Sequence, residues 1–314
     1  MEKPGMTDQS PPVGQPVDLA PGIRRIIAPN PSPMTYWGTN TYLLGQDTLM
    51  IIDPGPESTA HLLAVMAAIS GATVSHIIVT HSHLDHSPLA AVLADKVKAP
   101  VCAFGDSYVG KTGVMTRLEW AGLSGGGEGI DHTFVPNNLL ADSETVENSD
   151  LTLQVVHTPG HMGNHISLQW DDVIFTGDLV MGWASTMVSP PDGDLADFLN
   201  SCEKLKTYKA KRFYPGHGDP IDDPHARLDW LIAHRHERTE QIKQVLKSGP
   251  LDIHTITRQI YNDAPNGLLR AAARNVFAHL IQLETMDEVS AIPNLHPEAK
   301  FALKNTLDSA QNQH

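Results

Sequence analysis

The chain has 314 residues, a formal net charge of −14, 41% apolar and 18% charged residues. This composition is typical of a soluble globular protein with a sizeable core, and the acidic charge argues mildly against a nucleic-acid binder. Two cysteines, Cys102 and Cys202, exclude a disulfide framework and are interpreted as small core residues. No apolar run approaches the ~20 residues of a membrane span, so we expect no membrane partner.

The first 22 residues are rich in proline, glycine and polar side chains. They lack the apolar core of a signal peptide. We interpret residues 1–22 as a flexible N-terminal arm of a cytoplasmic protein. A catalytic domain is expected to follow at residues 23–249.

The next stretch alternates between strand and helix patterns. A β-hairpin is expected over residues 41–44 and 48–52, because two apolar runs flank a polar turn. It ends at Asp53-Pro54-Gly55, which no helix can cross. Helices are expected over 59–70, capped by Ser58, and from Pro88 to Val97, capped by Ser87, with strands over 74–80 and 100–104. This alternation predicts an α/β fold.

The second half continues the alternation after a different kind of segment. Residues 105–138 are rich in glycine and show little periodicity, so we expect a flexible loop over a functional site. The elements predicted after it are strands over 152–157, 166–170 and 173–176, and helices over 194–208 and 225–247.

The pattern changes after Pro250. Two helical patterns, over residues 252–261 and 267–286, predict a small helical domain and tail at residues 250–314. This region holds five basic and seven acidic residues, which argues against DNA as a partner.

A dense group of metal-binding side chains follows the buried strand over 74–80. Residues 81–86 read HSHLDH, and imidazole nitrogen and carboxylate oxygen are ligands that zinc prefers. Three later strands also end at a glycine- or proline-marked turn followed by a ligand-type residue. Since sites of α/β sheets form at the carboxyl ends of strands, we predict one metal centre. Its candidate ligands are His81, His83, Asp85, His86, His161, Asp178 and His217.

This set of residues, in this order, resembles the metallo-β-lactamase superfamily over roughly residues 20–220, and Asp53 fits as well. The resemblance implies a four-layer αβ/βα sandwich with two divalent metal ions at one edge. Zinc is the usual occupant, and iron or manganese occurs in relatives. The family pattern would assign His81, His83 and His161 to one metal, Asp85, His86 and His217 to the second, and Asp178 to both.

The second half resembles the β-lactamase-like protein 2 branch of that superfamily, in residues 177–183, 189–194 and 214–218. Members of that branch carry a small winged-helix-like C-terminal domain and include an RNA endonuclease. This sequence departs from the branch twice. No wing is obvious after Leu283, and residues 105–138 are longer and richer in glycine than expected from the endonuclease.

The expected chemistry is hydrolysis. Two cations ~3.5–4 Å apart can share a hydroxide and lower the pKa of its parent water. Asp85 could orient this nucleophile and accept a proton. His165 could meet the substrate or its leaving group, whereas His157 is either a partner of a ligand or a structural histidine. A further group, either an anion-recognising patch or a solvated face, is His234, Arg235 and Arg238.

We therefore expect a dinuclear zinc hydrolase acting on a small ester, thioester, lactone or amide. The alternative is a single-strand-specific endoribonuclease with RNA as its partner. A remote alternative is a P-loop nucleotide-binding protein, because residues 105–112 match the pattern G-x-x-x-x-G-K-T. The sequence leaves the oligomeric state open, a homodimer included.

Overall fold

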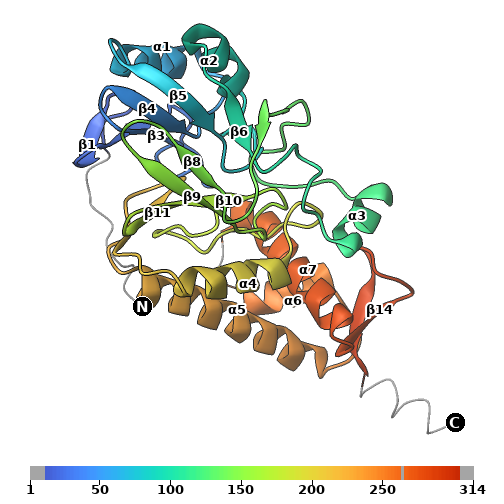
Figure 1. Cartoon of the computed structure of the whole chain (residues 1–314). Coiled ribbons are helices and arrows are strands. Elements are labelled where there is room, and N and C mark those ends of the chain that lie inside the picture. The colour runs from blue at the N-terminus through green and yellow to red at the C-terminus, as the bar shows by residue number, and fades with distance from the viewer. Residues whose placement is uncertain (1–10, 263–264, 305–314) are drawn as a thin grey trace, which may run out of the picture.

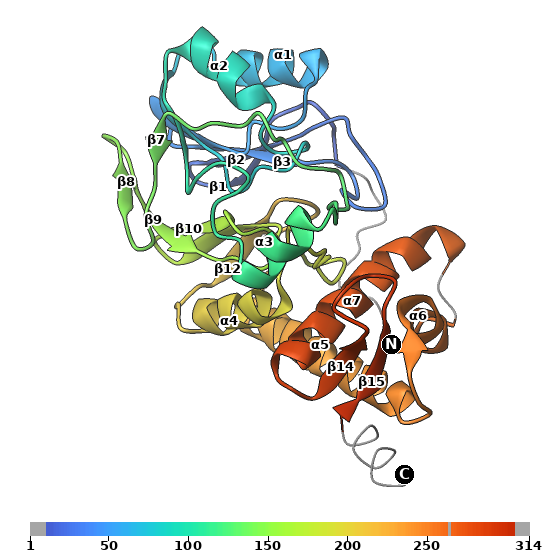
Figure 2. The same cartoon turned by 90° about the vertical axis from the view of Figure 1, so that its right-hand side faces the viewer.

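The structure, a computed structural model, describes residues 11–262 and 265–304. Two β-sheets lie face to face in the middle of the molecule, with helices on both outer sides (Figures 1 and 2). The first sheet has the order β1 (Val17–Ala20), β2 (Ile23–Ile27), β3 (Asn40–Leu44), β4 (Thr48–Ile52), β5 (Thr73–Ile78), β6 (Val101–Ala103) and β7 (Asn138–Leu139). The second has the order β12 (Arg212–Pro215), β11 (Val173–Gly177), β10 (Ile166–Trp170), β9 (Thr152–His157) and β8 (Thr145–Glu147).

Strand residues alternate between two apolar layers, as the period of two in a strand requires. Met50 and Ile52 of β4 point into the core between the sheets, where they join Phe175 of β11. Ile51 points the other way, into a core beneath helices α1 (Thr59–Ala68) and α2 (Leu89–Val97).

Helices α4 (Leu195–Lys206) and α5 (Pro224–Leu246) cover the outer face of the second sheet through Phe198 and Leu228. The order helix, sheet, sheet, helix confirms the predicted four-layer sandwich.

The starts of the first two helices differ in chemistry. The Ser58 hydroxyl accepts a hydrogen bond from the backbone N–H of His61 at 3.2 Å, which confirms the predicted cap of α1. The predicted cap of α2 is wrong, because Pro88 precedes this helix without a side-chain cap. The Ser87 hydroxyl instead donates to the Asp131 carboxylate at 2.9 Å and ties down the end of the histidine-rich loop.

The C-terminal region is a winged helix. It contains α6 (Ile253–Ile260), the short 3-10 helix η1 (Asn266–Leu268), α7 (Leu269–Thr285) and a sheet of order β13 (Leu251–Asp252), β15 (Lys300–Leu303) and β14 (Val289–Ile292). The expectation of no obvious wing is therefore corrected. The antiparallel strands β14 and β15 are joined by residues 293–299, a longer connection that needs no glycine turn, and Phe301 anchors them beside Phe277 of α7.

Helix α5 connects the two parts of the chain. Its Leu228 and Leu231 pack under the second sheet, whereas Ile242 and Leu246 belong to the C-terminal core. The segment 105–138 also contributes to that core. It contains helix α3 (Gly113–Trp120), whose Met115 and Leu118 are buried there. The expectation of a flexible loop is thus wrong for this helix. The boundary near residue 250 stays a prediction.

The N-terminal arm was expected to be flexible throughout. Residues 1–10 lie outside the described residues. The expectation is wrong for β1, which pairs antiparallel with β2. Within the part of the chain that the structure describes, no helix has both the length and the apolar character needed to cross a bilayer.

The layered core predicts a sharp contrast between two leucines. Leu168 of β10 is fully buried between the sheets, whereas the Leu63 side chain of α1 is 65% exposed. Leu168→Ala should lower the free energy of unfolding by about 2–5 kcal/mol. Leu63→Ala should change it by less than about 0.5 kcal/mol. Urea unfolding of both variants checks this, and equal shifts would contradict the assignment of Leu168 to the inner core.

Candidate metal centre

The seven predicted ligands come together at one edge of the sandwich. They lie in the loops that follow β5, β9, β11 and β12, and all are buried. They form two groups, and within each group the candidate ligand atoms lie within 4.8 Å of one another. The first group is His81, His83 and His161; the second is Asp85, His86, Asp178 and His217.

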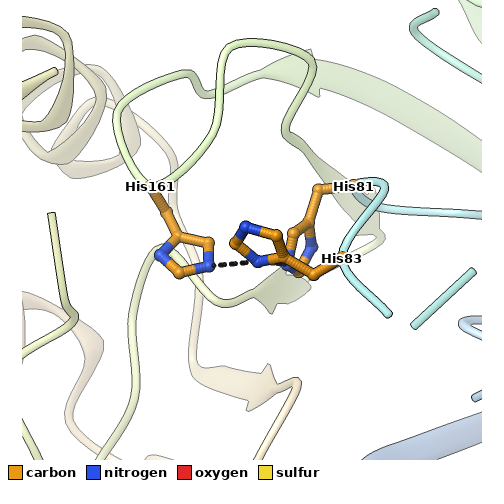
Figure 3. A group of neighbouring side chains, drawn as sticks. All are labelled: His81, His83 and His161. Carbon is orange, nitrogen blue, oxygen red and sulfur yellow. Dashed lines mark hydrogen bonds between the residues drawn. The ribbon is translucent and has the colours of Figure 1, made fainter. Parts of the chain in front are cut away.

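In the first group, three imidazoles point their ring edges at one another (Figure 3). The Nδ1 atom of His83 lies 3.0 Å from Nε2 of His81 and 3.0 Å from Nε2 of His161. Three tetrahedral ligands about 2.0–2.1 Å from one zinc ion lie roughly 3.3 Å apart. The spacing of these nitrogens therefore suits one metal ion.

In the second group, carboxylates alternate with imidazoles. Nε2 of His217 lies 3.1 Å from Oδ2 of Asp85 and 3.2 Å from Oδ2 of Asp178. Nε2 of His86 lies 3.4 Å from Oδ2 of Asp85 and 3.5 Å from Oδ1 of Asp178. Asp178 also reaches the first group, with Oδ2 at 3.7 Å from Nε2 of His161. It is the carboxylate placed between the two groups.

Asp53 and Thr80 determine which nitrogen of two histidines faces the site. Nδ1 of His86 lies 2.9 Å from Oδ2 of Asp53, so the ring donates there and keeps a lone pair on Nε2. The Thr80 hydroxyl donates to the same oxygen at 2.8 Å. It must therefore accept from Nδ1 of His81 at 3.0 Å, which leaves the Nε2 lone pair of His81 facing the site.

Two backbone carbonyls orient two more of the histidine rings in the same way. Nδ1 of His161 lies 2.9 Å from the Met187 carbonyl oxygen, and Nδ1 of His217 lies 3.2 Å from that of Gly38. A carbonyl only accepts, so both rings carry their proton on Nδ1. Four histidines thus direct Nε2 toward the site, which is the arrangement that outer partners impose on metal-ligating histidines.

The buried carboxylates of the second group are stabilised by positive charge beside them. Burial lowers the pKa of His217, but the carboxylates of Asp178 and Asp85 outweigh it and raise this pKa to about 10. Burial raises the pKa of Asp178, but His217 and His86 outweigh it and hold this pKa well below the usual range. The buried carboxylates thus draw protons onto the imidazoles when no other cation is present, and a divalent cation would supply the same charge.

Space for the carboxylate between the groups depends on a glycine. A Cβ atom on Gly216 would lie 2.3 Å from Oδ1 of Asp178 and 2.8 Å from Cε1 of His86. That same Oδ1 atom is buried and has no hydrogen-bond partner within residues 11–262 and 265–304. Converging imidazole nitrogens, two carboxylates and a buried carboxylate oxygen without a hydrogen bond all fit divalent cations.

The other predicted histidines occupy different settings. His165 is fully buried, its Nε2 accepts the backbone N–H of Asp178 at 3.1 Å, and its Nδ1 lies 3.0 Å from the Thr158 hydroxyl. Both ring nitrogens are therefore engaged away from a substrate. His157 stacks on Phe104 at 3.8 Å between ring centroids and supports a loop rather than a ligand.

The segment that matches a P-loop has another use. The Lys111 ammonium lies 2.6 Å from the Glu119 carboxylate and 3.6 Å from that of Asp192. The Thr112 hydroxyl donates to Asp194 at 3.0 Å and accepts from Met115, which caps α3. Both residues that would meet phosphate and its magnesium are thus committed to protein partners, so the structure does not support nucleotide binding there.

A cavity of about 370 Å³ opens directly onto the candidate centre. Five of the seven candidate ligands line it, namely His83, Asp85, His161, Asp178 and His217. Three residues of α5 also line the cavity, namely His234, Arg235 and Arg238, which favours the anion-recognising interpretation over a solvated face.

The roles of Thr80 and Met187 were not predicted from the sequence. A threonine directly before His81 was a possible signal, whereas a backbone carbonyl carries none.

Replacement of Asp178 should reduce metal content. Asp178→Asn keeps the size of the side chain but removes the charge that lies between the groups. We expect purified variant to lose at least about one of two metal equivalents, measured by inductively coupled plasma mass spectrometry. Asp171→Asn, at an exposed turn position with φ of +50°, is the matched control. Wild-type content in Asp178→Asn would contradict the placement.

Asp53 should act on metal affinity without touching the metal. Asp53→Ala removes the acceptor that orients His86 and, through Thr80, His81. Loss of such an outer partner should weaken binding roughly 10–100-fold, measured by competition with a chromophoric chelator. Asp47→Ala, in an exposed hairpin turn, should leave the affinity unchanged. Equal affinities for both variants would show that Asp53 does not orient the ligands.

Comparisons with known proteins agree with this geometry. The family model described as metallo-β-lactamase superfamily matches residues 34–217, and the β-lactamase associated winged helix domain matches residues 253–294. The β-lactamase-like protein 2 homolog of Drosophila melanogaster is 30% identical over 276 residues, covering 85% of this chain and 89% of that protein. An atrochrysone carboxyl ACP thioesterase from Aspergillus fumigatus is 27% identical over 238 residues, covering 73% and 66%.

Solved structures show the same fold. A β-lactamase domain protein from Burkholderia ambifaria has a TM-score of 0.76 at 24% identity, covering 94% of this chain and 95% of that one. A metallo-β-lactamase family protein from Thermus thermophilus has a TM-score of 0.72 at 23% identity, covering 91% and 100%. With family models matching both parts and a relative at 30% identity over most of its length, this chain belongs to the metallo-β-lactamase superfamily and is a hydrolase.

Proposed function

We propose that this hydrolase cleaves small acyl thioesters and esters with two zinc ions. His81, His83 and His161 would hold one ion, Asp85, His86 and His217 the other, and Asp178 both. The observation that carries the proposal is the convergence of these side chains beside a cavity of about 370 Å³, five of them in its lining. That volume falls in the range of roughly 300–1,000 Å³ that is typical of small-molecule sites.

The chain's own residues would prepare the attack on the carbonyl carbon. Bound divalent cations generate a nucleophile from water at neutral pH and polarise the carbonyl group. Asp85 lines the cavity, so it can orient the attacking water and accept its proton. The Met187 carbonyl and Asp53 hold His161 and His86 in place, so little reorganisation is needed when substrate enters.

We assign His165 a positioning role in place of the predicted contact with substrate. Its ring accepts the backbone N–H of Asp178 and is braced by Thr158 on the other side. Gly177, with φ of +46°, leaves the space for this ring, because a Cβ atom there would lie 2.6 Å from Nε2 of His165. His165 would therefore act through Asp178.

The character of the cavity supports an acyl substrate. Four of its lining residues, Met34, Met181, Met187 and Trp183, are large and apolar, and methionines adapt to irregular apolar groups. The similarity to a fungal protein named as an acyl-carrier thioesterase points to the same class. No comparable observation favours RNA, which stays the alternative.

A substrate panel tests the proposal. Zinc-loaded protein should hydrolyse acyl thioesters or esters of small thiols and alcohols. Asp178→Asn should lower kcat/KM roughly 100-fold or more, exceeding the roughly 10–100-fold effect of an outer partner. Asp171→Asn should match wild type. Cleavage of single-stranded RNA by wild type that Asp178→Asn abolishes, with no thioester or ester hydrolysis, would replace the proposal by the endonuclease alternative.

A further inference from the structure

The winged-helix domain forms one wall of the cavity at the candidate metal centre. Tyr261 follows α6, and the remaining wall residues lie on or next to α7. They lie in the same cavity as Asp85 and Asp178, so a substrate at the metals would also meet the C-terminal domain. The wall residues are Tyr261, Leu268, Ala271, Ala272 and Asn275.

Arg238 lines the same cavity beside this wall and has no acidic partner among the described residues. It extends from α5, its guanidinium lies 4.5 Å from the centre of the Tyr261 ring, and its Nη1 donates to Gln241 at 2.6 Å. Its Nε is buried and has no hydrogen-bond partner among the described residues. Nor does Arg238 form an ion pair with an Asp or Glu in the described part of the chain. A planar donor group held over a ring is thus left with unused donors.

The two neighbouring basic residues, Arg235 and His234, are not available to bind an anion in place of Arg238. Arg235 is fully buried, with its guanidinium bonded to Asn275 and to the Thr186 carbonyl, so it holds the wall together. His234 stacks on Trp230, and burial lowers its pKa to about 4, so it adds no charge at neutral pH.

Carboxylates near the cavity are also engaged elsewhere. Besides Asp85 and Asp178, Glu128 is the acidic side chain that lines the cavity within residues 11–262 and 265–304. It is exposed and accepts a hydrogen bond from the Ser32 hydroxyl at 2.7 Å. The C-terminal wall of the cavity also contributes apolar side chains, namely Leu268, Ala271 and Ala272.

We propose that Arg238 binds an oxyanion of the substrate and makes the enzyme selective for anionic acyl thioesters or esters. A guanidinium binds carboxylate and phosphate through two parallel N–H donors, and it does so more strongly where water is excluded. The oxyanion is either a carboxylate at the far end of the acyl group or a phosphate at the far end of the thiol leaving group. This inference rests on the proposed function, because the scissile carbonyl must reach the metals.

Three thioesters separate the two sources of the anion. Glutaryl-N-acetylcysteamine carries a carboxylate at the end of its acyl group, and butyryl-phosphopantetheine carries a phosphate at the end of its thiol group. Butyryl-N-acetylcysteamine is neutral. Arg238→Gln should raise KM for one anionic thioester at least about tenfold with kcat little changed, and leave the neutral thioester unaffected. The identity of the affected thioester identifies the oxyanion. Arg258→Gln, which removes an exposed guanidinium from α6, should match wild type.

Calorimetry provides a readout that does not require turnover. Zinc-loaded wild type should bind glutarate or phosphopantetheine at least about tenfold more tightly than Arg238→Gln, with Arg238→Lys in between, since lysine keeps the charge but loses the planar fork. Binding without hydrolysis of any thioester would sustain the role of Arg238 and overturn the proposed function. Equal losses for neutral and anionic thioesters, or equal binding by wild type and both variants, would overturn the role of Arg238.

Discussion

The structure depends on burying two carboxylates and several imidazole lone pairs at one point. Asp85 and Asp178 lie beside His86 and His217 in a region almost free of solvent, and such a group is costly unless positive charge enters it. Other residues of the chain hold these buried groups in place. Asp53 occupies a left-handed turn with φ of +50° after β4, and its carboxylate fixes both the Thr80 backbone and the His86 ring.

The fold places these groups through its parallel strands. β4, β5 and β6 run parallel, as do β11 and β12, so their carboxyl ends deliver Asp53, His81 and Asp178 to one edge. The winged-helix domain then closes the other side of the cavity through α7. We propose that chemistry and selectivity are thereby divided, with hydrolysis at the loops of the sandwich and substrate recognition at α5 and the C-terminal wall.

Much of this could be predicted because the pattern is local. The apolar run ending at His81 and the turns before His161, Asp178 and His217 indicate strand ends directly, and the structure brings all four together. The setting of His165 could not be predicted, since its partner is a backbone N–H, which no residue type in the sequence marks.

Other features were not predictable because they depend on long-range packing. The wing has no glycine turn to mark it, and α3 is stabilised by the C-terminal core rather than by a strong pattern of its own. The cavity wall likewise forms only when α7 packs against α5, so the sequence could offer Arg238 as a candidate for anion recognition but could not decide between that role and a solvated face.

We propose that seven side chains hold two divalent cations. Anomalous X-ray diffraction from crystals of the zinc-loaded protein, measured across the zinc edge, tests it most directly. We expect two peaks per chain, one among the facing nitrogens of His81, His83 and His161, and one among Asp85, His86 and His217, with Asp178 beside both. No peak within this group of residues, or zinc bound only elsewhere on the chain, would contradict the claim.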